Sequence, residues 1–99
     1  MNKTQLKNQI VESLKGQKEI ERIIIFGSFN KSDFPNDLDI AVVQNSSENY
    51  LTLAMKYRKL IRKVSREIAI DIFPILDKTE NSLFKNEVES GEVIYARGN

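Results

Sequence analysis

The sequence lacks cysteine and histidine altogether, and these two absences exclude much of enzyme chemistry. Without cysteine there can be no disulfide, no thiolate zinc site and no cysteine nucleophile. Without histidine there is no Ser-His-Asp triad, and the commonest transition-metal ligand is missing as well. Any catalysis must therefore use carboxylates, amines, hydroxyls or a hard metal ion.

The chain also lacks a large charge of either sign and a long apolar run. Lys and Arg total 15 against 14 acidic residues, so the net charge of +1 does not by itself require a nucleic-acid or membrane partner. No apolar run approaches the ~18 residues of a membrane span. The first residues, MNKTQLKNQI, have no apolar core of the signal-peptide kind. We expect no membrane association and, by default, a cytoplasmic location.

Length and periodicity predict one small domain of mixed secondary structure over residues 1–99. Apolar residues at helical spacing predict helices at Asn2–Lys15, Glu48–Arg66 and Thr79–Ser90. Short β-branched runs predict strands at Ile20–Phe26, Asp37–Val43, Ile68–Ile75 and Glu92–Ala96, the last at an edge. Because only about ten residues join the first two strands, too few for a helical crossover, the sheet should be mixed. The fold class is therefore α/β.

Two acidic residues stand at the start of the second predicted strand, in the run DLDIAVV. Since strand side chains alternate between faces, Asp37 and Asp39 should share one face, with their Cα atoms roughly 6.5–7 Å apart. Leu38 and Ile40 would then point into the core. Two like charges side by side repel each other, and a divalent cation between them would remove that cost. Oxygen-only ligands favour Mg²⁺ or Mn²⁺.

A third carboxylate, Asp71, interrupts the apolar run IAIDIFPI. A carboxylate among apolar neighbours is costly without a partner. If the strands containing Asp39 and Asp71 are neighbours, three carboxylates can converge on one metal ion. Plainer interpretations stay open, because a D-x-D at a strand start is often a solvated entry and Asp71 can be an edge residue that faces water. The combination of all three carboxylates with a glycine-serine pair upstream favours a site.

That glycine-serine pair ends the first predicted strand. Glycine lets the backbone turn sharply and approach a ligand closely, so Gly27 fits the end of a buried strand, where ligands gather in open α/β sheets. Ser28 is expected to cap a short helical turn reaching roughly to Asp33. Free N–H groups and a hydroxyl suit phosphate oxygens, so this turn is a candidate phosphate site.

The stretch GSFNKSDFPNDLDIAVV resembles the signature of the minimal nucleotidyltransferase (MNT) domain proteins of the DNA polymerase β superfamily. The likeness covers nearly the whole chain, and Asp71 stands where the family has its third carboxylate. It implies the nucleotidyltransferase fold, a small mixed sheet of about four strands with helices mainly on one side. It also implies three catalytic, metal-holding residues, Asp37, Asp39 and Asp71, and three nucleotide-binding residues, Gly27, Ser28 and Lys31.

One loop departs from that family pattern. The stretch from Phe29 to Asn36 is shorter than usual and lacks the customary second glycine, and Lys31 stands near where an arginine is common. These differences affect the expected geometry of the loop and the expected nucleotide preference more than they affect the predicted carboxylate site.

The resemblance implies a Mg²⁺- or Mn²⁺-dependent transfer of a nucleoside monophosphate, AMP from ATP, to a hydroxyl on a partner macromolecule. Small proteins of this kind are frequently antitoxins of a helical HEPN-domain toxin, which they can modify with AMP. Two alternatives stay open: a weakly active or inactive module that neutralises its partner by docking alone, and the catalytic subunit of a small-molecule or RNA nucleotidyltransferase. RNA and a second copy of the chain are further partners that the sequence leaves open.

The predicted helix Glu48–Arg66 and three aromatic residues complete the candidates. The helix carries a row of basic residues, which is either a solvated face, a surface for an acidic partner or RNA, or support for the triphosphate; they are Lys56, Arg58, Lys59, Arg62, Lys63 and Arg66. Phe29, Phe34 and Tyr50 are expected to complete the core rather than to stack on a base.

Overall fold

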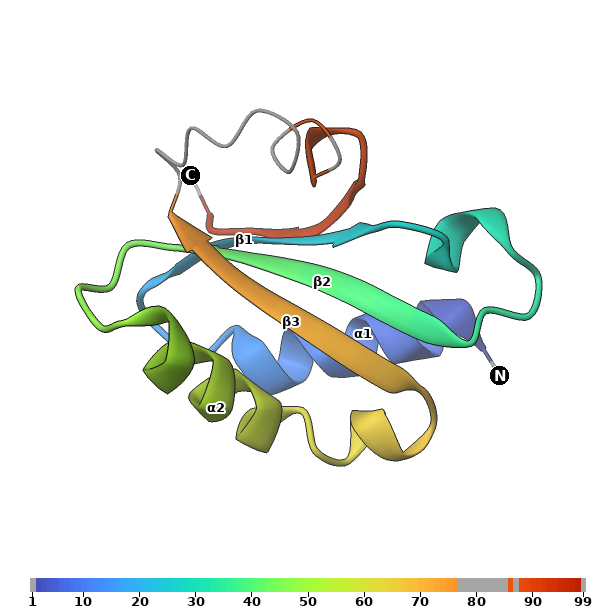
Figure 1. Cartoon of the computed structure of the whole chain (residues 1–99), viewed down its shortest axis with the longest axis horizontal. Coiled ribbons are helices and arrows are strands. Elements are labelled where there is room, and N and C mark those ends of the chain that lie inside the picture. Colours follow the sequence, from blue (N-terminus) through green and yellow to red (C-terminus); the bar gives the residue numbers. More distant parts are fainter. Residues whose placement is uncertain (1, 77–85, 87, 99) are drawn as a thin grey trace.

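The computed structural model describes residues 2–76, 86 and 88–98 of the chain. Two α-helices and two short 3₁₀ turns alternate with the strands; they are α1 (Lys3–Leu14), α2 (Tyr50–Leu60), η1 (Phe29–Lys31) and η2 (Val64–Arg66). The strands are β1 (Ile20–Phe26), β2 (Asp37–Gln44), β3 (Ala69–Leu76) and β4 (Glu92–Ala96). Both α-helices lie against one face of the sheet (Figure 1).

The strands form one mixed sheet in the order β3-β2-β1-β4. β1 runs antiparallel to β2 and to β4, whereas β2 and β3 are parallel. The predicted mixed sheet of four strands, with β4 at an edge and the helices mainly on one side, is confirmed. β3 is the other edge strand, and an edge position explains how Pro74, which has no N–H to donate, stands inside it.

Alternation along the strands divides the buried side chains into two layers. Beneath the helices, Leu6, Ile10 and Leu14 of α1 and Leu53 and Tyr57 of α2 pack on alternate strand residues such as Leu38, Ile40 and Ile72. On the other face, the next residues along the strands form a smaller cluster with Val88; they are Ile24, Phe26, Ala41 and Val43. The helix-covered face therefore holds most of the core, and the second face is only partly covered by described residues.

The second helix is shorter than its sequence predicts. α2 ends at Leu60, and the chain continues through a turn and the 3₁₀ turn η2, so the continuous helix expected up to Arg66 is wrong. Ile61 and Val64 are nevertheless buried in the main core. Their apolar spacing, which suggested an unbroken helix, is satisfied by the turn as well as it would be by a helix. Leu60, the last residue of α2, is 38% exposed.

The third predicted helix, Thr79–Ser90, lies largely outside the described residues. Asn86, Val88 and Glu89 are helical. Val88 is buried against the second face of the sheet. After this helical segment, Gly91 donates its N–H to the carbonyl of Val88 at 3.0 Å, and glycine is common directly after the end of a helix.

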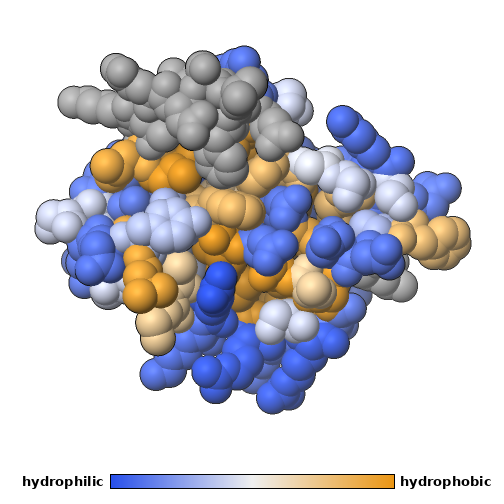
Figure 2. All heavy atoms as spheres, viewed as in Figure 1, coloured by the Kyte–Doolittle hydropathy of each residue, from blue (hydrophilic) through white to orange (hydrophobic). Residues whose placement is uncertain are grey.

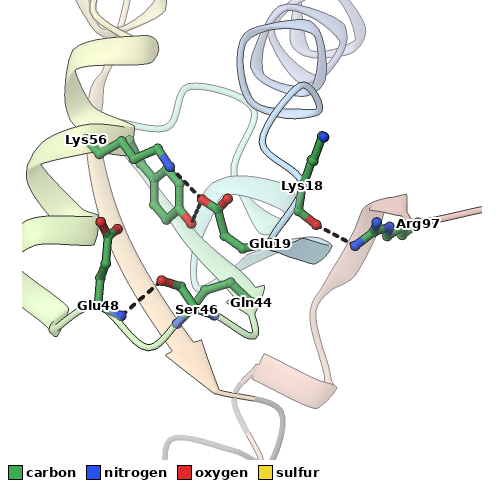
Figure 3. A network of polar contacts seen from close by, with 8 residues as sticks. Lys18, Glu19, Gln44, Ser46, Glu48, Lys56 and Arg97 are labelled. Atoms are coloured by element: carbon green, nitrogen blue, oxygen red, sulfur yellow. Dashed lines mark hydrogen bonds and ion pairs between the residues drawn. The ribbon is translucent and has the colours of Figure 1, made fainter.

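A polar network lies at the end of the sheet where β1 starts and β2 finishes (Figure 3). Glu19 accepts hydrogen bonds from the Tyr57 hydroxyl at 2.8 Å and from the Lys56 ammonium at 2.9 Å. Burial by itself would raise the pKa of the Glu19 carboxyl, but the hydrogen bonds from Lys56, its own backbone and Tyr57 outweigh burial and lower that pKa. Burial and the Glu19 carboxylate raise the pKa of Tyr57. The network ties α2 to the start of β1.

We expect Glu19→Gln to destabilise the protein at neutral pH by about 1–2 kcal/mol, because the amide oxygen can still accept from Lys56 and Tyr57 but lacks the charge that strengthens both hydrogen bonds. Because folding lowers the pKa of Glu19, its carboxylate stabilises the fold above the ordinary Glu pKa. That stabilisation is lost as the pH falls through the folded pKa. The difference in urea unfolding between variant and wild type should therefore shrink below about pH 4. The control is Glu12→Gln, since Glu12 makes an exposed ion pair with Lys15 and its loss should change little.

Candidate functional site

The structure brings the three predicted carboxylates to one face of the sheet. In the parallel pair of β2 and β3, Asp39 stands directly beside Asp71, and Asp37 beside Ala69. Paired residues of neighbouring strands point to the same face. Their chain neighbours Leu38 and Ile40 are buried under the helices, so the carboxylates lie on the opposite face, as alternation predicts.

The donor set has the chemistry of a hard-cation site. Asp37 and Asp71 are exposed and Asp39 is half-buried. Neighbouring strands lie about 4.8 Å apart, so the side chains of Asp39 and Asp71 can turn toward one ion. Among the residues described, however, no three acidic side chains already form a metal-ligating group. The backbone thus places the oxygen donors, and an ion would have to draw the side chains together.

Gly27 packs directly against the side chain of Asp39. It has a φ of +78°, in the left-handed region that favours glycine, and it is the one described residue with a positive φ. A Cβ atom at this position would stand 2.6 Å from Oδ2 of Asp39. Both the turn and the close approach therefore require glycine, and the predicted sharp bend at the end of β1 is confirmed.

The serine after it plays a different structural part from the one predicted. Ser28 has a helical backbone conformation and its side chain makes no capping hydrogen bond, so the expected hydroxyl cap is wrong. The turn is closed instead by the Ser28 carbonyl, which accepts from the N–H groups of Lys31 and Ser32 at 3.0 and 3.1 Å. It ends at Lys31 rather than near Asp33. Gly27, Ser28 and Lys31 are exposed, which leaves them accessible to a ligand.

Lys3 fixes this loop from the start of α1. Its ammonium group donates to the carbonyl of Phe29 at 2.8 Å and to the carbonyl of Ser32. It also stands 5.1 Å from the centre of the Phe29 ring, which is fully buried. No local sequence signal connects Lys3 with residues more than twenty positions away, so sequence reasoning missed it.

Two of the three aromatic residues lie outside the core. Phe29 is buried as expected, but Phe34 is 90% and Tyr50 53% exposed, so that prediction was wrong for both. Phe34 belongs to the loop between η1 and β2 and Tyr50 begins α2, so neither is on a strand face.

The basic residues of α2 lie across the sheet from the carboxylates. α2 packs on the helix-covered face through Leu53 and Tyr57, whereas the carboxylates stand on the other face. Arg58 and Lys59 point to solvent, and Lys56 forms an ion pair with Glu19. This arrangement argues against one of the three interpretations of these cations, namely that the basic residues of α2 support a triphosphate bound at the carboxylates.

Comparison with known families assigns the chain to one of them. The profile of the family described as polymerase beta, nucleotidyltransferase matches residues 8–99. The chain therefore belongs to this family, and its fold is the nucleotidyltransferase fold.

Several solved structures of similar fold are chains of toxin–antitoxin complexes. A chain of the complex of tri-AMPylated Shewanella oneidensis HEPN toxin with MNT antitoxin superimposes with a TM-score of 0.62 at 19% identity, covering 94% of this chain and 71% of that one. A chain of the MntA-HepT toxin–antitoxin gives 0.62 at 17%, covering 95% and 73%. A chain of a toxin–antitoxin with AMP-PNP gives 0.63 at 21%, covering 91% and 73%. At these identities the likeness establishes the fold.

No curated protein matches the chain significantly. Among the helices that the structure describes, none is both long and apolar enough to cross a membrane.

Proposed function

We propose that this chain is a Mg²⁺-dependent nucleotidyltransferase that moves AMP from ATP to a hydroxyl on a partner macromolecule, as the antitoxin of a HEPN toxin pair. The observation that carries the proposal is the register of Asp39 beside Asp71, next to the Gly27 turn. The family supports nucleotidyl transfer. The similar folds in complexes of a HEPN toxin with an MNT antitoxin, and in one containing AMP-PNP, support the partner and the nucleotide.

Each candidate residue has a role in this proposal. The backbone of Gly27 and the hydroxyl of Ser28 would bind triphosphate oxygens, and the Lys31 ammonium would add positive charge. Asp37, Asp39 and Asp71 would hold Mg²⁺, which when bound would neutralise charge on the triphosphate and on the leaving group. Mn²⁺ would suit the same oxygen ligands.

The transfer itself is an in-line displacement. The acceptor oxygen forms a bond to the α-phosphorus, the bond from that phosphorus to the α–β bridging oxygen breaks, and pyrophosphate leaves. Asp71 would accept the proton of the attacking hydroxyl. Positioning and charge stabilisation would supply most of the rate, so the absence of histidine is no obstacle.

The direct test is intact-mass measurement of the HEPN-domain protein from the same genome after incubation with this chain, ATP and Mg²⁺. We expect a mass increase of one or more AMP groups that EDTA prevents. Parallel reactions with the other nucleoside triphosphates would establish the base preference. An unchanged partner mass under all of these conditions would contradict the proposal.

The second candidate is a binding module that neutralises its partner without chemistry. The observation in its favour is that the three carboxylates do not stand as a ready-made ligand group in the described part of the chain. The two candidates differ in whether neutralisation needs the carboxylates, so the Asp39→Asn variant separates them.

A further inference from the structure

The most exposed large apolar side chain among the described residues is Phe34, at 90%. It lies in the loop that joins η1 to β2, three residues before Asp37. Three residues of extended chain span at most about 11 Å, so its Cα lies within that distance of the Asp37 Cα. An exposed phenyl ring therefore stands on the loop that leads directly into the strand of Asp37 and Asp39.

The loop around this ring is held in place. The N–H of Phe34 donates to the Ser32 hydroxyl at 3.2 Å, and Lys3 binds the carbonyls of Ser32 and Phe29. Pro35 follows, and a residue before proline is restricted to extended conformations. An exposed aromatic side chain on a fixed loop loses little conformational freedom on binding, which is typical of an interface anchor.

We propose that Phe34 anchors this chain to the protein that supplies the acceptor hydroxyl, by entering an apolar pocket on that protein. The proposal rests on the proposed function and names the element that positions its acceptor. Because 90% of Phe34 is exposed, its own chain covers little of the ring, and an apolar pocket on a partner protein would bury more of that apolar surface than one stacked nucleotide base would.

A rival surface exists on α2. Tyr50, Leu51 and Met55 are 53%, 65% and 61% exposed, and apolar side chains reach the surface over this helix at the left of Figure 2. A partner seated there would face the helix side of the sheet, away from the carboxylates. Leu51 is therefore the matched control: an exposed apolar residue whose truncation leaves the loop of Phe34 untouched.

The experiment compares Phe34→Ala and Leu51→Ala with the wild type. Binding to the HEPN-domain protein of the same genome is measured by calorimetry with AMP-PNP and Mg²⁺ present, so that no transfer occurs. Phe34→Ala should weaken binding about tenfold or more, as for an aromatic anchor, and Leu51→Ala should leave it unchanged. Both variants should bind a fluorescent ATP analogue as the wild type does and should melt at the same temperature.

Three results would overturn the anchor: wild-type affinity in Phe34→Ala, weakening by Leu51→Ala alone, or a loss confined to nucleotide binding, which would make Phe34 a base-stacking residue. A wild type that binds the HEPN-domain protein without transferring AMP would reject the proposed chemistry while the Phe34 comparison still decides the anchor. A wild type that does not bind that protein rejects both.

Discussion

Asp39→Asn is expected to slow nucleotidyl transfer roughly a thousandfold while leaving the fold and partner binding intact. Asparagine has nearly the same shape, so the packing against Gly27 and the strand register persist. It removes one negative oxygen from the site where a divalent cation would bind, at the strand pair where Asp39 stands beside Asp71. Losing that electrostatic stabilisation is worth several kcal/mol, which corresponds to roughly a 10³-fold fall in rate. Transfer of radiolabelled AMP to the partner, at saturating Mg²⁺, measures it.

Asp33→Asn is the control for this change. It makes the same chemical substitution at an exposed residue of the preceding loop and should transfer AMP at the wild-type rate. Asp71→Asn should show the same loss as Asp39→Asn. Transfer that survives in both site variants would remove the carboxylates from the mechanism. Neutralisation of the toxin that survives without transfer would instead favour the docking module over the enzyme.

The carboxylate face could be predicted from the sequence because it follows from local geometry. Alternation places Asp37 and Asp39 opposite Leu38, and an apolar run interrupted only by Asp71 requires a strand whose acidic residue leaves the core. What alternation does not give is the pairing of β2 with β3 in a register that sets Asp39 beside Asp71. Strand pairing depends on contacts between residues that are far apart in sequence. The convergence of the three carboxylates could therefore be predicted only on the assumption that the two strands are neighbours.

The details that the sequence did not predict depend on contacts between distant residues. The hydrogen bonds from Lys3 to the loop after β1 join residues that are far apart in sequence. The end of α2 at Leu60 is another case, because Ile61 and Val64 keep helical spacing while packing from a turn. Phe34 was expected in the core because its side chain is large and apolar, but the path of its loop leaves the ring exposed to solvent.

Gly27→Ala should damage stability and activity together. Alanine in the left-handed region costs about 1–2 kcal/mol. In addition, the new Cβ would stand 2.6 Å from Oδ2 of Asp39, so that carboxylate must move. We expect the free energy of unfolding to fall by about 1–3 kcal/mol, which urea denaturation measures.

The displaced carboxylate separates this variant from a merely unstable one. At a temperature where Gly27→Ala is still fully folded, its transfer rate should remain well below that of the wild type, because Asp39 no longer holds its place beside Asp71. Gly16→Ala is the matched control, since a Cβ at Gly16 meets nothing within 4 Å and the residue has no positive φ. If folded Gly27→Ala transfers AMP as fast as Gly16→Ala, the position of Asp39 against the turn does not matter to the chemistry. A slow but fully folded variant would instead show that the bend after β1 sets the place of the carboxylate on which the transfer depends.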